Sequence, residues 1–465
     1  MTNKVSMNLW VAVLVVVVVA IVGVAAYYYY KPSSVPSTGV SITFWEAFSP
    51  SEYNAFASKI LPAFEAQHPN IHVLITNVSL STSNFETAAV AASAPNVYVD
   101  SNNDEGLLYS AGLLLNLNPY LGSSYFSQFA TGPLNSVSVQ NGTVVFGLPL
   151  NENSILMYYN KAYITNSSVL SNTGALLPYL TNLNNTKGIW GFAYGMGATY
   201  GYVEAAWLAG FGGGLFKYGT YGAPTLNSSA MVNALEFWYN QTFINHINPD
   251  LGSGSGVSFA SGLEGQLFET GKAAIMFDGP WDLVPLVNAL GTNLGAAPLP
   301  KVSSTGQYFA PILGSNAIAV TVPQASGASA AQINASITFA EFLASSQAQA
   351  WMYNGSGDLP SNNVVLSQLI SSAQAGTLLP PFAAAENLTA AEFSGVEQGI
   401  LAQEQGHTIP QPSTPQMNYY YSGVSGMHPE LGLYYTNKTI TAQDVASCVQ
   451  AFVASNGTIT LPACS

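Results

Sequence analysis

Hydrophobic residues recur along this chain at the two spacings that distinguish helices from strands. In residues 52–67, Phe56, Ile60 and Phe64 lie four positions apart, which places them on one face of a helix. Residues 272–277 are mostly apolar and are bounded by turn residues at both ends, a pattern that indicates a buried strand. The two patterns alternate beyond residue 40, and this alternation predicts an α/β fold with helices on mostly parallel sheets.

The same patterns predict where the main elements lie. Residues 144–161 hold two strand-like runs joined by Gly-Leu-Pro-Leu-Asn-Glu-Asn, and we expect the chain to cross there between two lobes. Ligands of α/β sheets bind beyond the carboxyl ends of the strands, so Trp45-Glu46 and residues 100–105 are candidate binding loops. The predicted strands are 41–45, 71–77, 97–99, 272–277 and 317–322, and the predicted helices are 52–67, 84–94, 107–111, 231–243, 330–351 and 442–454.

The first forty residues differ from the rest of the chain. Residues 9–26 are apolar throughout, and a helix from Trp10 to Tyr30 would be about 31 Å long, enough to span a bilayer with aromatic residues at both ends. This pattern predicts a transmembrane anchor over residues 9–30, after a short tail (1–8) and before a Pro/Ser linker (31–40). The run is too long for a cleaved signal peptide, and processing near Lys4 by a pilin-type peptidase is an alternative that keeps the anchor.

Charged side chains are scarce, at 7% of 465 residues, and all nine basic residues are lysines. The net charge of −14 argues against nucleic-acid binding, which needs a basic surface. A surface of hydroxyl, amide and tyrosine side chains suits an acidic exterior, where carboxylates are partly neutralised. We therefore hypothesise an acidic habitat.

Two further features indicate the outside of a cell. The only cysteines, Cys448 and Cys464, lie close together near the C-terminus, and outside the cell they would form a disulfide; two buried thiols are the alternative. Many Asn-x-Ser/Thr sequons are candidate glycosylation sites. They are Asn77, Asn141, Asn166, Asn184, Asn227, Asn240, Asn334, Asn354, Asn387, Asn437 and Asn456.

No motif of an enzyme or a metal site is complete in this sequence. Residues 100–106 differ from a calcium-binding EF-hand loop because the glycine is one place late and the twelfth position is Ala111. The five histidines lack ligand spacing apart from His68 and His72, which straddle a proline. There is no nucleophile elbow, no P-loop and no Gly-x-Gly-x-x-Gly after a strand. We therefore expect no enzymatic activity, no metal and no cofactor.

Aromatic rings, carboxylates and amides on loops after strands suit the recognition of sugars. Ring faces pack on the C–H patches of a pyranose, while Asp, Glu and Asn form hydrogen bonds with its hydroxyl groups. Trp281 follows the predicted strand 272–277 and the rigid turn Gly279-Pro280, which would present its ring to a ligand. A core tryptophan behind a turn is the alternative.

Three motifs resemble, in order and spacing, the solute-binding proteins of ABC sugar importers in the maltose-binding-protein-like group. The resemblance covers about residues 41–460, including residues 100–115 and Pro415-Gln-Met-x-Tyr-Tyr-Tyr. It implies the two-lobed periplasmic-binding-protein-like fold (type II), with lobe one at 41–150 plus 308–352 and lobe two at 151–307 plus 353–465. The motifs are Phe44-Trp45, Gly147-x-Pro149 with Tyr159-Asn160-Lys161, and Gly271-Lys-Ala-Ala with Gly279-Pro280-Trp281.

The resemblance also implies a sugar-binding cleft between the lobes, with Trp281 stacked on the ligand. A maltose-type site has acids or lysine where this chain has Ser49, Pro50, Asn103 and Asn153, so the resemblance does not imply maltose itself. The implied ligand-binding residues are Trp45, Glu46, Ser49, Asn103, Asp104, Glu152, Asn153, Tyr200, Tyr202, Trp281, Tyr420 and Tyr421.

Together these features predict a membrane-anchored extracellular substrate-binding protein that captures a sugar or oligosaccharide and delivers it to an ABC importer. The expected partners are a carbohydrate ligand and the permease subunits in the cell membrane, with the globular body outside the cell. The alternatives are a structural or adhesive surface glycoprotein with the same fold, and a binder of peptides or another solute.

Overall fold

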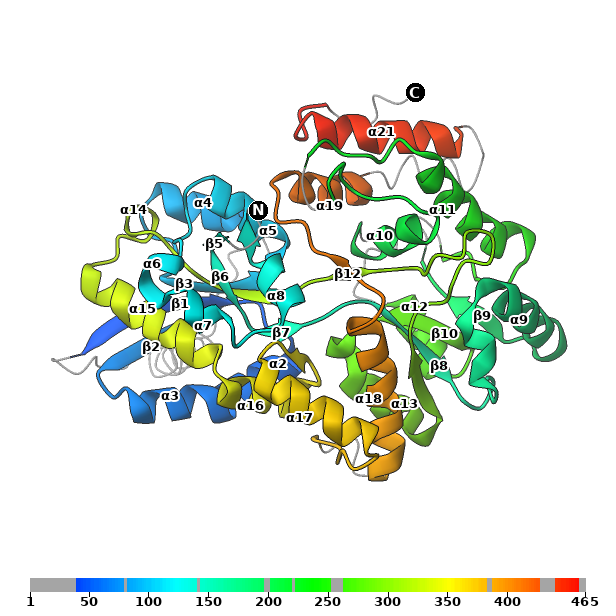
Figure 1. The fold of residues 1–465 in the computed structure, drawn as a ribbon, viewed down its shortest axis with the longest axis horizontal. Helices are drawn as coiled ribbons and strands as arrows, with labels where there is room; N and C mark the ends of the chain where they lie inside the picture. Colours follow the sequence, from blue (N-terminus) through cyan, green and yellow to red (C-terminus); the bar gives the residue numbers. More distant parts are fainter. Residues whose placement is uncertain are drawn as a thin grey trace, which may run out of the picture.

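The computed structural model describes residues 39–78, 82–139, 143–195, 201–219, 222–251, 262–382, 387–426 and 440–459. These residues form two lobes, each built around a β-sheet that carries helices on both faces (Figure 1). The predicted anchor over residues 9–30 and its linker lie outside the described residues. Within the described ranges, no helix combines the length and apolar character that a membrane span requires.

The first sheet has five strands in the order β2-β1-β3-β13-β6. β1 pairs in parallel with β2 and β3, whereas β13 is antiparallel to β3 and to β6. The sheet is therefore mixed. Its antiparallel strand, β13, inserts between β3 and β6 and comes from much later in the chain. The strands are β1 (Val40–Glu46), β2 (Ile71–Asn77), β3 (Val97–Ser101), β6 (Gly147–Pro149) and β13 (Asn316–Val320).

The second sheet has four strands in the order β11-β8-β10-β9. Only β9 and β10 are parallel, since β8 runs opposite to both of its neighbours. The prediction of mostly parallel sheets is thus wrong for this lobe. The strands are β8 (Leu156–Asn160), β9 (Trp190–Ala193), β10 (Ala273–Asp278) and β11 (Leu294–Ala297).

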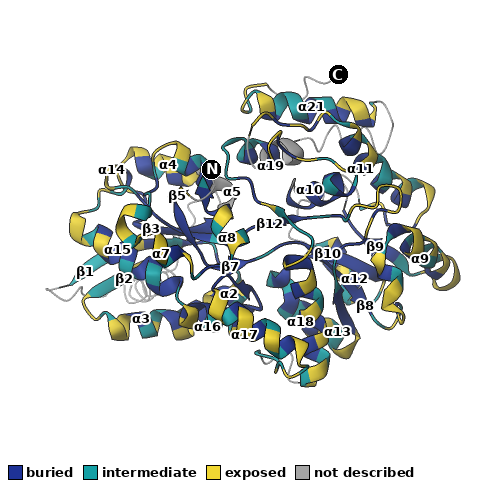
Figure 2. Ribbon diagram, in the orientation of Figure 1, coloured by how far each residue is buried: buried dark blue, intermediate teal, exposed yellow. Residues whose placement is uncertain are grey.

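Alternate side chains of the central strands fill a core on each face of each sheet. On β10, Ile275 and Phe277 lie in one core and Met276 lies in the opposite one. The first of these cores also holds Trp207 and Trp238, which are both fully buried. Figure 2 shows buried strands in both lobes and exposed residues on the outer surfaces of the helices. Burial on both faces explains why β10 reads as a continuous apolar run.

The helices around the first sheet confirm some predicted elements and correct others. The predicted helix 52–67 is present, with a π-helical turn in its middle. The predicted helix 330–351 is two helices, because the Ser345 side chain accepts a hydrogen bond from the Ala348 N–H and caps a new start. The helices are α2 (Pro50–Ala55), η1 (Phe56–Ile60), α3 (Leu61–Gln67), α4 (Thr82–Val90), α5 (Asn102–Ser110), α6 (Asn118–Leu121), α7 (Ser123–Phe126), α8 (Thr131–Ser136), α14 (Pro323–Ser326), α15 (Ala330–Leu343) and α16 (Ser346–Ser356).

The remaining helices lie outside the group around the first sheet. The predicted last helix and its Thr441 cap are confirmed, since Thr441 and Asp444 form a capping box. These helices are η2 (Ser167–Ser171), α9 (Thr173–Lys187), α10 (Gly201–Gly210), α11 (Ser229–Tyr239), η4 (Asn240–Ile244), α12 (Leu263–Glu269), η5 (Pro280–Asp282), α13 (Leu283–Leu290), η6 (Gly291–Asn293), α17 (Asn363–Gln374), α18 (Ala390–Glu404), α19 (Gln416–Gly426) and α21 (Ala442–Ala454).

Short paired strands lie where the chain passes between the lobes (Figure 1). β7 (Asn151–Glu152) pairs with β14 (Leu359–Pro360), and β12 (Ile312–Leu313) pairs with β15 (Ile409–Pro410). A separate hairpin joins β4 (Ser138–Val139) to β5 (Val144–Val145). The strands of the first sheet come from residues 40–149 and 316–320, and those of the second from residues 156–297. The lobe boundaries given above stay a prediction.

Candidate functional site

Trp281 lies directly beyond the carboxyl end of β10, a central strand of the second sheet. Helix α12 ends at Glu269, and Gly271 turns the chain with a φ of 70° before the strand begins. After the strand, Gly279 and the short helix η5 carry Trp281 out of the sheet. The indole is partly buried against the core that contains Phe277. The strand and turn therefore place a large ring at the edge where α/β sheets bind ligands.

The structure brings three of the predicted binding residues together. The Tyr202 hydroxyl donates a hydrogen bond to the backbone carbonyl oxygen of Asn153 at 2.9 Å and lies 3.5 Å from Oδ1 of the Asn153 side chain. The ring centroid of Tyr202 lies 6.3 Å from that of Trp281. Tyr202 belongs to α10, Trp281 to η5, and Asn153 follows β7. Two rings and an amide side chain from three separate segments thus meet at one place. This set suits stacking on a sugar ring and hydrogen bonding to its hydroxyl groups.

Glu152 lies beside this group but faces inward. It is almost fully buried, and its Oε1 accepts a hydrogen bond from Gln405 Nε2 at 2.6 Å. Glu404, the last residue of α18, accepts from the Ser154 N–H at 2.7 Å, and Gln405 directly follows the helix. Burial raises the pKa of both glutamates above the usual range. In this structure Glu152 therefore ties the crossover strand to α18, and its role in ligand binding stays a prediction.

The predicted binding residues on the first sheet are engaged within the protein. Glu46 is fully buried and accepts hydrogen bonds from the Phe48 N–H at 2.7 Å and from Asn77 Nδ2 at 3.0 Å. Ser49 caps α2 in a capping box, and Trp45 packs against a core of the first lobe. These contacts explain their positions without a ligand. Their part in binding stays a prediction.

Other predicted residues lie in the core or outside the described residues. Tyr420 is fully buried, and the Tyr421 hydroxyl donates to Gln411 Oε1 at 3.2 Å. Residues 102–105 were expected in a loop, but α5 begins at Asn102, so Asn103 and Asp104 lie on a helix. The side chains of these two residues are outside the described part of the structure. Tyr200 also lies outside the described residues.

Several buried carboxyl groups were not anticipated from the sequence. Asp278, Glu397 and Glu404 are fully or almost fully buried, and no lysine is among the groups that shift their pKa values. Burial raises the pKa of Glu397 to about 8 and that of Glu204 to about 7. Such groups are neutral at acid pH and serve as hydrogen-bond donors there. Nothing in a single sequence marks these acids as buried, apart from the low count of basic residues.

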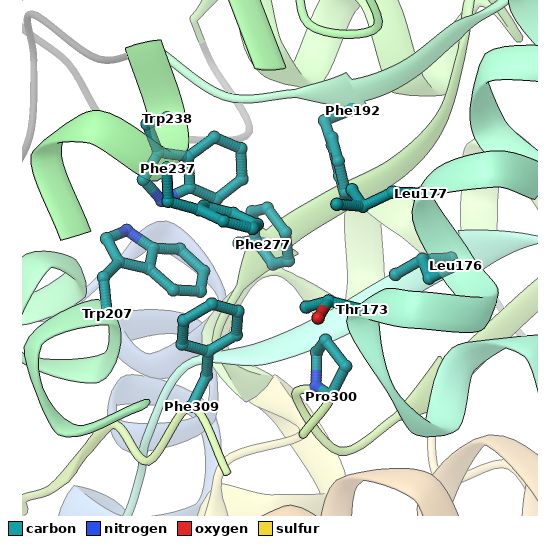
Figure 3. A pocket seen from close by; sticks show the side chains of 10 residues that line it. All are labelled: Thr173, Leu176, Leu177, Phe192, Trp207, Phe237, Trp238, Phe277, Pro300 and Phe309. Carbon is teal, nitrogen blue, oxygen red and sulfur yellow. The ribbon is translucent and has the colours of Figure 1, made fainter. Parts of the chain in front are cut away.

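Two cavities are lined by described residues that do not include Trp281. The smaller, about 10 Å³, lies between Trp207, Phe277 and Phe309 and has room for a single water at most (Figure 3). The larger, about 380 Å³, is lined by residues that include Tyr159 and the stacked pair Tyr308 and His407, whose ring centroids are 3.6 Å apart. No group of three or more His, Cys, Asp or Glu residues in the described part of the chain is arranged to hold a metal ion.

The sequons and cysteines that indicate an extracellular location lie partly within the described residues. Asn184 is half-buried, and the other described sequon asparagines are exposed: Asn77, Asn166, Asn227, Asn240, Asn334, Asn354, Asn387 and Asn456. Asn141 and Asn437 lie outside the described residues. Cys448 is buried on α21, and Cys464 lies outside the described residues. The glycans and the disulfide therefore stay predictions.

Sequence comparisons find relatives for most of the chain. The profile of a family described as "Bacterial extracellular solute-binding protein" matches residues 49–350. The chain is 22% identical over 271 residues to a maltotriose-binding protein of Pyrococcus abyssi (58% of this chain, 56% of the relative). It is 29% identical over 238 residues to the maltodextrin-binding protein MdxE of Bacillus subtilis (48% and 52%). The chain spans about half the length of these curated relatives.

A structural comparison covers a larger share of the chain. The maltose/maltodextrin-binding domain MalE from Bdellovibrio bacteriovorus, solved bound to maltotriose, superposes with a TM-score of 0.69 at 21% identity. The match covers 90% of this chain and 99% of that domain. At this identity the likeness shows the fold, which is the two-lobed α/β fold that the sequence resemblance implied.

Proposed function

Because the chain belongs to the family of bacterial extracellular solute-binding proteins, we propose that it captures a sugar or oligosaccharide between its two lobes and delivers it to an ABC importer. The observation that carries this proposal is the meeting of Trp281, Tyr202 and Asn153 beyond the end of β10. Trp281 would stack on one face of a pyranose, and Asn153 would bind a hydroxyl group.

The ligand class that we favour is a short α-glucan such as maltotriose. The curated relatives are named for maltotriose and maltodextrin binding, and the structural neighbour was solved with maltotriose. Departures at Ser49 and Asn103, where a maltose-type site has acids or lysine, argue for a different set of hydroxyl contacts. Maltose itself is therefore not the preferred ligand.

The location of the protein is part of the proposal. We expect residues 9–30 to anchor the chain in the cell membrane, with the globular body outside, where the exposed sequons would carry glycans and Cys448 would pair with Cys464. The permease subunits would be partners in the same membrane. Recovery of the native protein in the medium with its N-terminus near Tyr30 would contradict the anchor.

A thermal-shift screen of the full-length protein against sugars tests the function. A ligand that binds only the folded state raises the melting temperature, by an amount equivalent to about 2.7 kcal/mol at a hundred times its Kd. We expect maltotriose or a related oligosaccharide to produce such a shift. A shift with peptides and none with sugars would favour the peptide-binding alternative, and no shift with any solute would favour the structural or adhesive one.

Replacing Trp281 by alanine tests the site. Loss of the stacking ring should weaken sugar binding by about 1–3 kcal/mol, or roughly 5- to 150-fold, in isothermal titration. Tyr120→Ala is the matched control, because Tyr120 is an aromatic residue that is 49% exposed and lies in the first lobe. Unchanged affinity in Trp281→Ala would place the ligand elsewhere.

A further inference from the structure

The indole of Trp281 lies on the backbone of Gly279. A Cβ atom placed on Gly279 would be 2.2 Å from Cη2, 2.2 Å from Cζ3 and 2.5 Å from Cε3 of Trp281. Nearly equal distances to these successive ring atoms put the Cβ over the face of the six-membered ring, because an approach in the ring plane would lengthen at least one of them. Gly279 therefore covers one face of the indole, and a ligand would stack on the opposite face.

The lack of a side chain at Gly279 is required by the indole and not by the backbone. Gly279 has a φ of −100° and a ψ of 179°, an extended conformation that alanine also adopts. A methyl group at this position would overlap the ring, because non-bonded carbon atoms pack at about 3.5–4.0 Å. Gly279→Ala would thus displace the indole while leaving the strand and the turn able to form.

Hydrogen bonds fix the peptide under the ring. The Tyr158 hydroxyl, from the neighbouring strand β8, donates to the Gly279 carbonyl oxygen at 3.1 Å. The same oxygen accepts from the Asp282 N–H at 3.3 Å, which closes the turn of η5 around Trp281. The Gly279 N–H donates to Oδ1 of Asp278 at 2.7 Å. Of these partners, Tyr158 comes from another strand, so its hydroxyl sets where the turn stands relative to the sheet.

Packing restrains the same turn. Pro280 is buried at the start of η5. Gly357, directly after α16, has a φ of 87°, and a Cβ there would lie 3.3 Å from Cδ2 of Leu283 and 3.5 Å from the Pro280 carbonyl oxygen. Contacts with β8 and with the loop after α16 leave the turn little room to move, so the position of the indole is set before a ligand arrives.

Tyr163 makes an equivalent bond at the other end of β10. Its hydroxyl donates to the Gly271 carbonyl oxygen at 2.6 Å, before the strand begins, whereas Tyr158 binds the Gly279 carbonyl oxygen after the strand ends. Both phenols tie a glycine carbonyl group, but only Tyr158 does so at the turn that carries Trp281. An effect that belongs to the placement of the ring should therefore follow loss of the Tyr158 hydroxyl and not of the Tyr163 hydroxyl.

We propose that Gly279 and Tyr158 are positioning residues for Trp281: Gly279 leaves the space in which the indole lies, and the Tyr158 hydroxyl fixes the turn against β8. The inference rests on the proposed function in taking Trp281 as the ligand platform. Neither residue needs to contact the sugar, because each acts through the orientation of the ring. With one face of the indole covered, a single pyranose stacks at Trp281.

Fluorine NMR of the full-length protein carrying 5-fluorotryptophan tests the ring position without a ligand. The label is attached to Cζ3, one of the two ring atoms nearest to the added Cβ. The protein has seven tryptophans, and the signal of Trp281 is the one missing from Trp281→Phe. This signal should shift in Gly279→Ala and in Tyr158→Phe. It should keep its native position in Tyr163→Phe and in Gly214→Ala, where an added Cβ meets a single atom at 3.9 Å.

Titration with maltotriose gives the functional readout. Gly279→Ala should weaken binding about tenfold or more, because the displaced ring no longer meets the sugar in the required orientation. Tyr158→Phe should weaken it about two- to tenfold, the contribution of one hydrogen bond. Tyr163→Phe should bind as the native protein does, even where its melting temperature falls as far as that of Tyr158→Phe. A merely structural role for Tyr158 would give the two tyrosine variants equal affinities.

Two results would overturn the inference: a Trp281 signal at its native position in both Gly279→Ala and Tyr158→Phe, or an equal shift of that signal in Tyr163→Phe. If Gly279→Ala does not fold, Tyr158→Phe decides alone, because it removes a single oxygen atom. Absence of maltotriose binding by the native protein would count against the proposed ligand. The fluorine signals would still show whether Gly279 and Tyr158 place the ring, so the two proposals fail separately.

Discussion

Three described tryptophans occupy two kinds of environment. Trp207 and Trp238 are fully buried, and their ring centroids lie 4.9 Å apart in a T-shaped pair. Trp281 is partly buried and projects from a short turn onto Gly279. The first two rings fill the core of a lobe, whereas the third is only partly buried. Replacing a core tryptophan should therefore mainly lower stability, whereas replacing Trp281 should mainly weaken ligand binding.

The stability contrast between Trp238 and Trp281 can be measured by urea unfolding without ligand. Trp238→Ala should lower the free energy of unfolding by about 3–5 kcal/mol, because it removes a large core side chain. Trp281→Ala should lower it by no more than about 1 kcal/mol, since most of the ring packs at the edge of the core. A loss for Trp281→Ala as large as that for Trp238→Ala would show that Trp281 is a core residue.

The surroundings of Glu397 shift the pKa of its carboxyl group. It is fully buried on α18 beside Tyr353, and burial raises its pKa from 4.5 to about 8. A raised folded pKa means that the stability contribution of neutral Glu397 is complete below about pH 4.5. That contribution is lost as the pH rises towards 8, where the folded protein must ionise a buried group.

Glu397→Gln should remove this loss. At pH 4 the variant and the native protein should have similar free energies of unfolding, because both side chains are neutral. At pH 8 the variant should be more stable by up to a value on the order of 4 kcal/mol, measured by urea titration at both pH values. Glu65→Gln, at an exposed position on α3, should change neither value. Equal pH dependence in the native protein and Glu397→Gln would refute the assignment.

At the scale of elements, α18 and β11 approach more closely than any side chain between them would allow. A Cβ atom on Gly399 would lie 2.0 Å from the carbonyl oxygen of Ala296. Because the obstacle is backbone, it cannot rotate away. Gly395, one turn earlier on the same helix, is exposed and has nothing within 4 Å of an added Cβ.

These two glycines make a matched pair of substitutions on one helix. Gly399→Ala should lower the melting temperature, because α18 must move away from β11, with a loss of about 1–3 kcal/mol expected for overpacking. Gly395→Ala should raise stability by about 0.5–1 kcal/mol, since alanine is the better helix former. Calorimetry of both variants measures the difference. If Gly399→Ala raised the melting temperature, α18 would not pack against β11 as closely as described.

The sequence predicts elements well where a periodic pattern and a cap coincide. The last helix, with Thr441 as its cap, and the strand before Gly279 were both found where the pattern placed them. Polarity alone misled at residues 102–105, since a run of Asn, Asp and Glu also forms the first turn of α5, where acids suit the helix dipole. The predicted strand 317–322 is present as β13, but its antiparallel direction could not be foreseen, because the direction depends on how the chain crosses back from the second sheet.

At the scale of the whole molecule, the buried acids should make stability depend strongly on pH. Burial raises the pKa values of Glu52, Glu152, Glu204, Asp358 and Glu397. The folded state then binds more protons than the unfolded state between about pH 4.5 and pH 8, so stability falls as the pH rises through this window. The few charged residues and the lack of arginine suggested an acidic habitat from composition, and the buried acids are independent support for it.

Thermal unfolding across pH measures the sum of these effects. The melting temperature should be highest near pH 4 and should fall progressively up to pH 8, in contrast to most proteins, whose stability is greatest between about pH 5 and pH 8. Glu52, Glu397 and Glu204 lie in different parts of the fold, so their effects should be roughly additive. A maximum near neutral pH would contradict both the pKa shifts and the acidic habitat.

The candidate binding site was predictable only where a motif placed it. Gly279-Pro280-Trp281 located the ring, and the Pro149–Asn153 segment located the amide that meets Tyr202. The sequence could not reveal that Glu46 is buried against Asn77, or that Tyr420 fills a core, because both facts depend on which strand or helix lies opposite. The close approach of Gly279 to the indole of Trp281 likewise appears only in three dimensions.

The buried carboxyl groups also make unfolding an acid-releasing reaction. Near pH 6, neutral acids such as Glu397 and Glu204 lose their protons when the chain opens, and the buffer takes them up. The heat of unfolding measured by calorimetry then includes the heat of buffer protonation. An amine buffer such as imidazole, whose protonation releases heat, should give a smaller apparent enthalpy than phosphate at the same pH. The difference between the two buffers counts the protons that this fold stores.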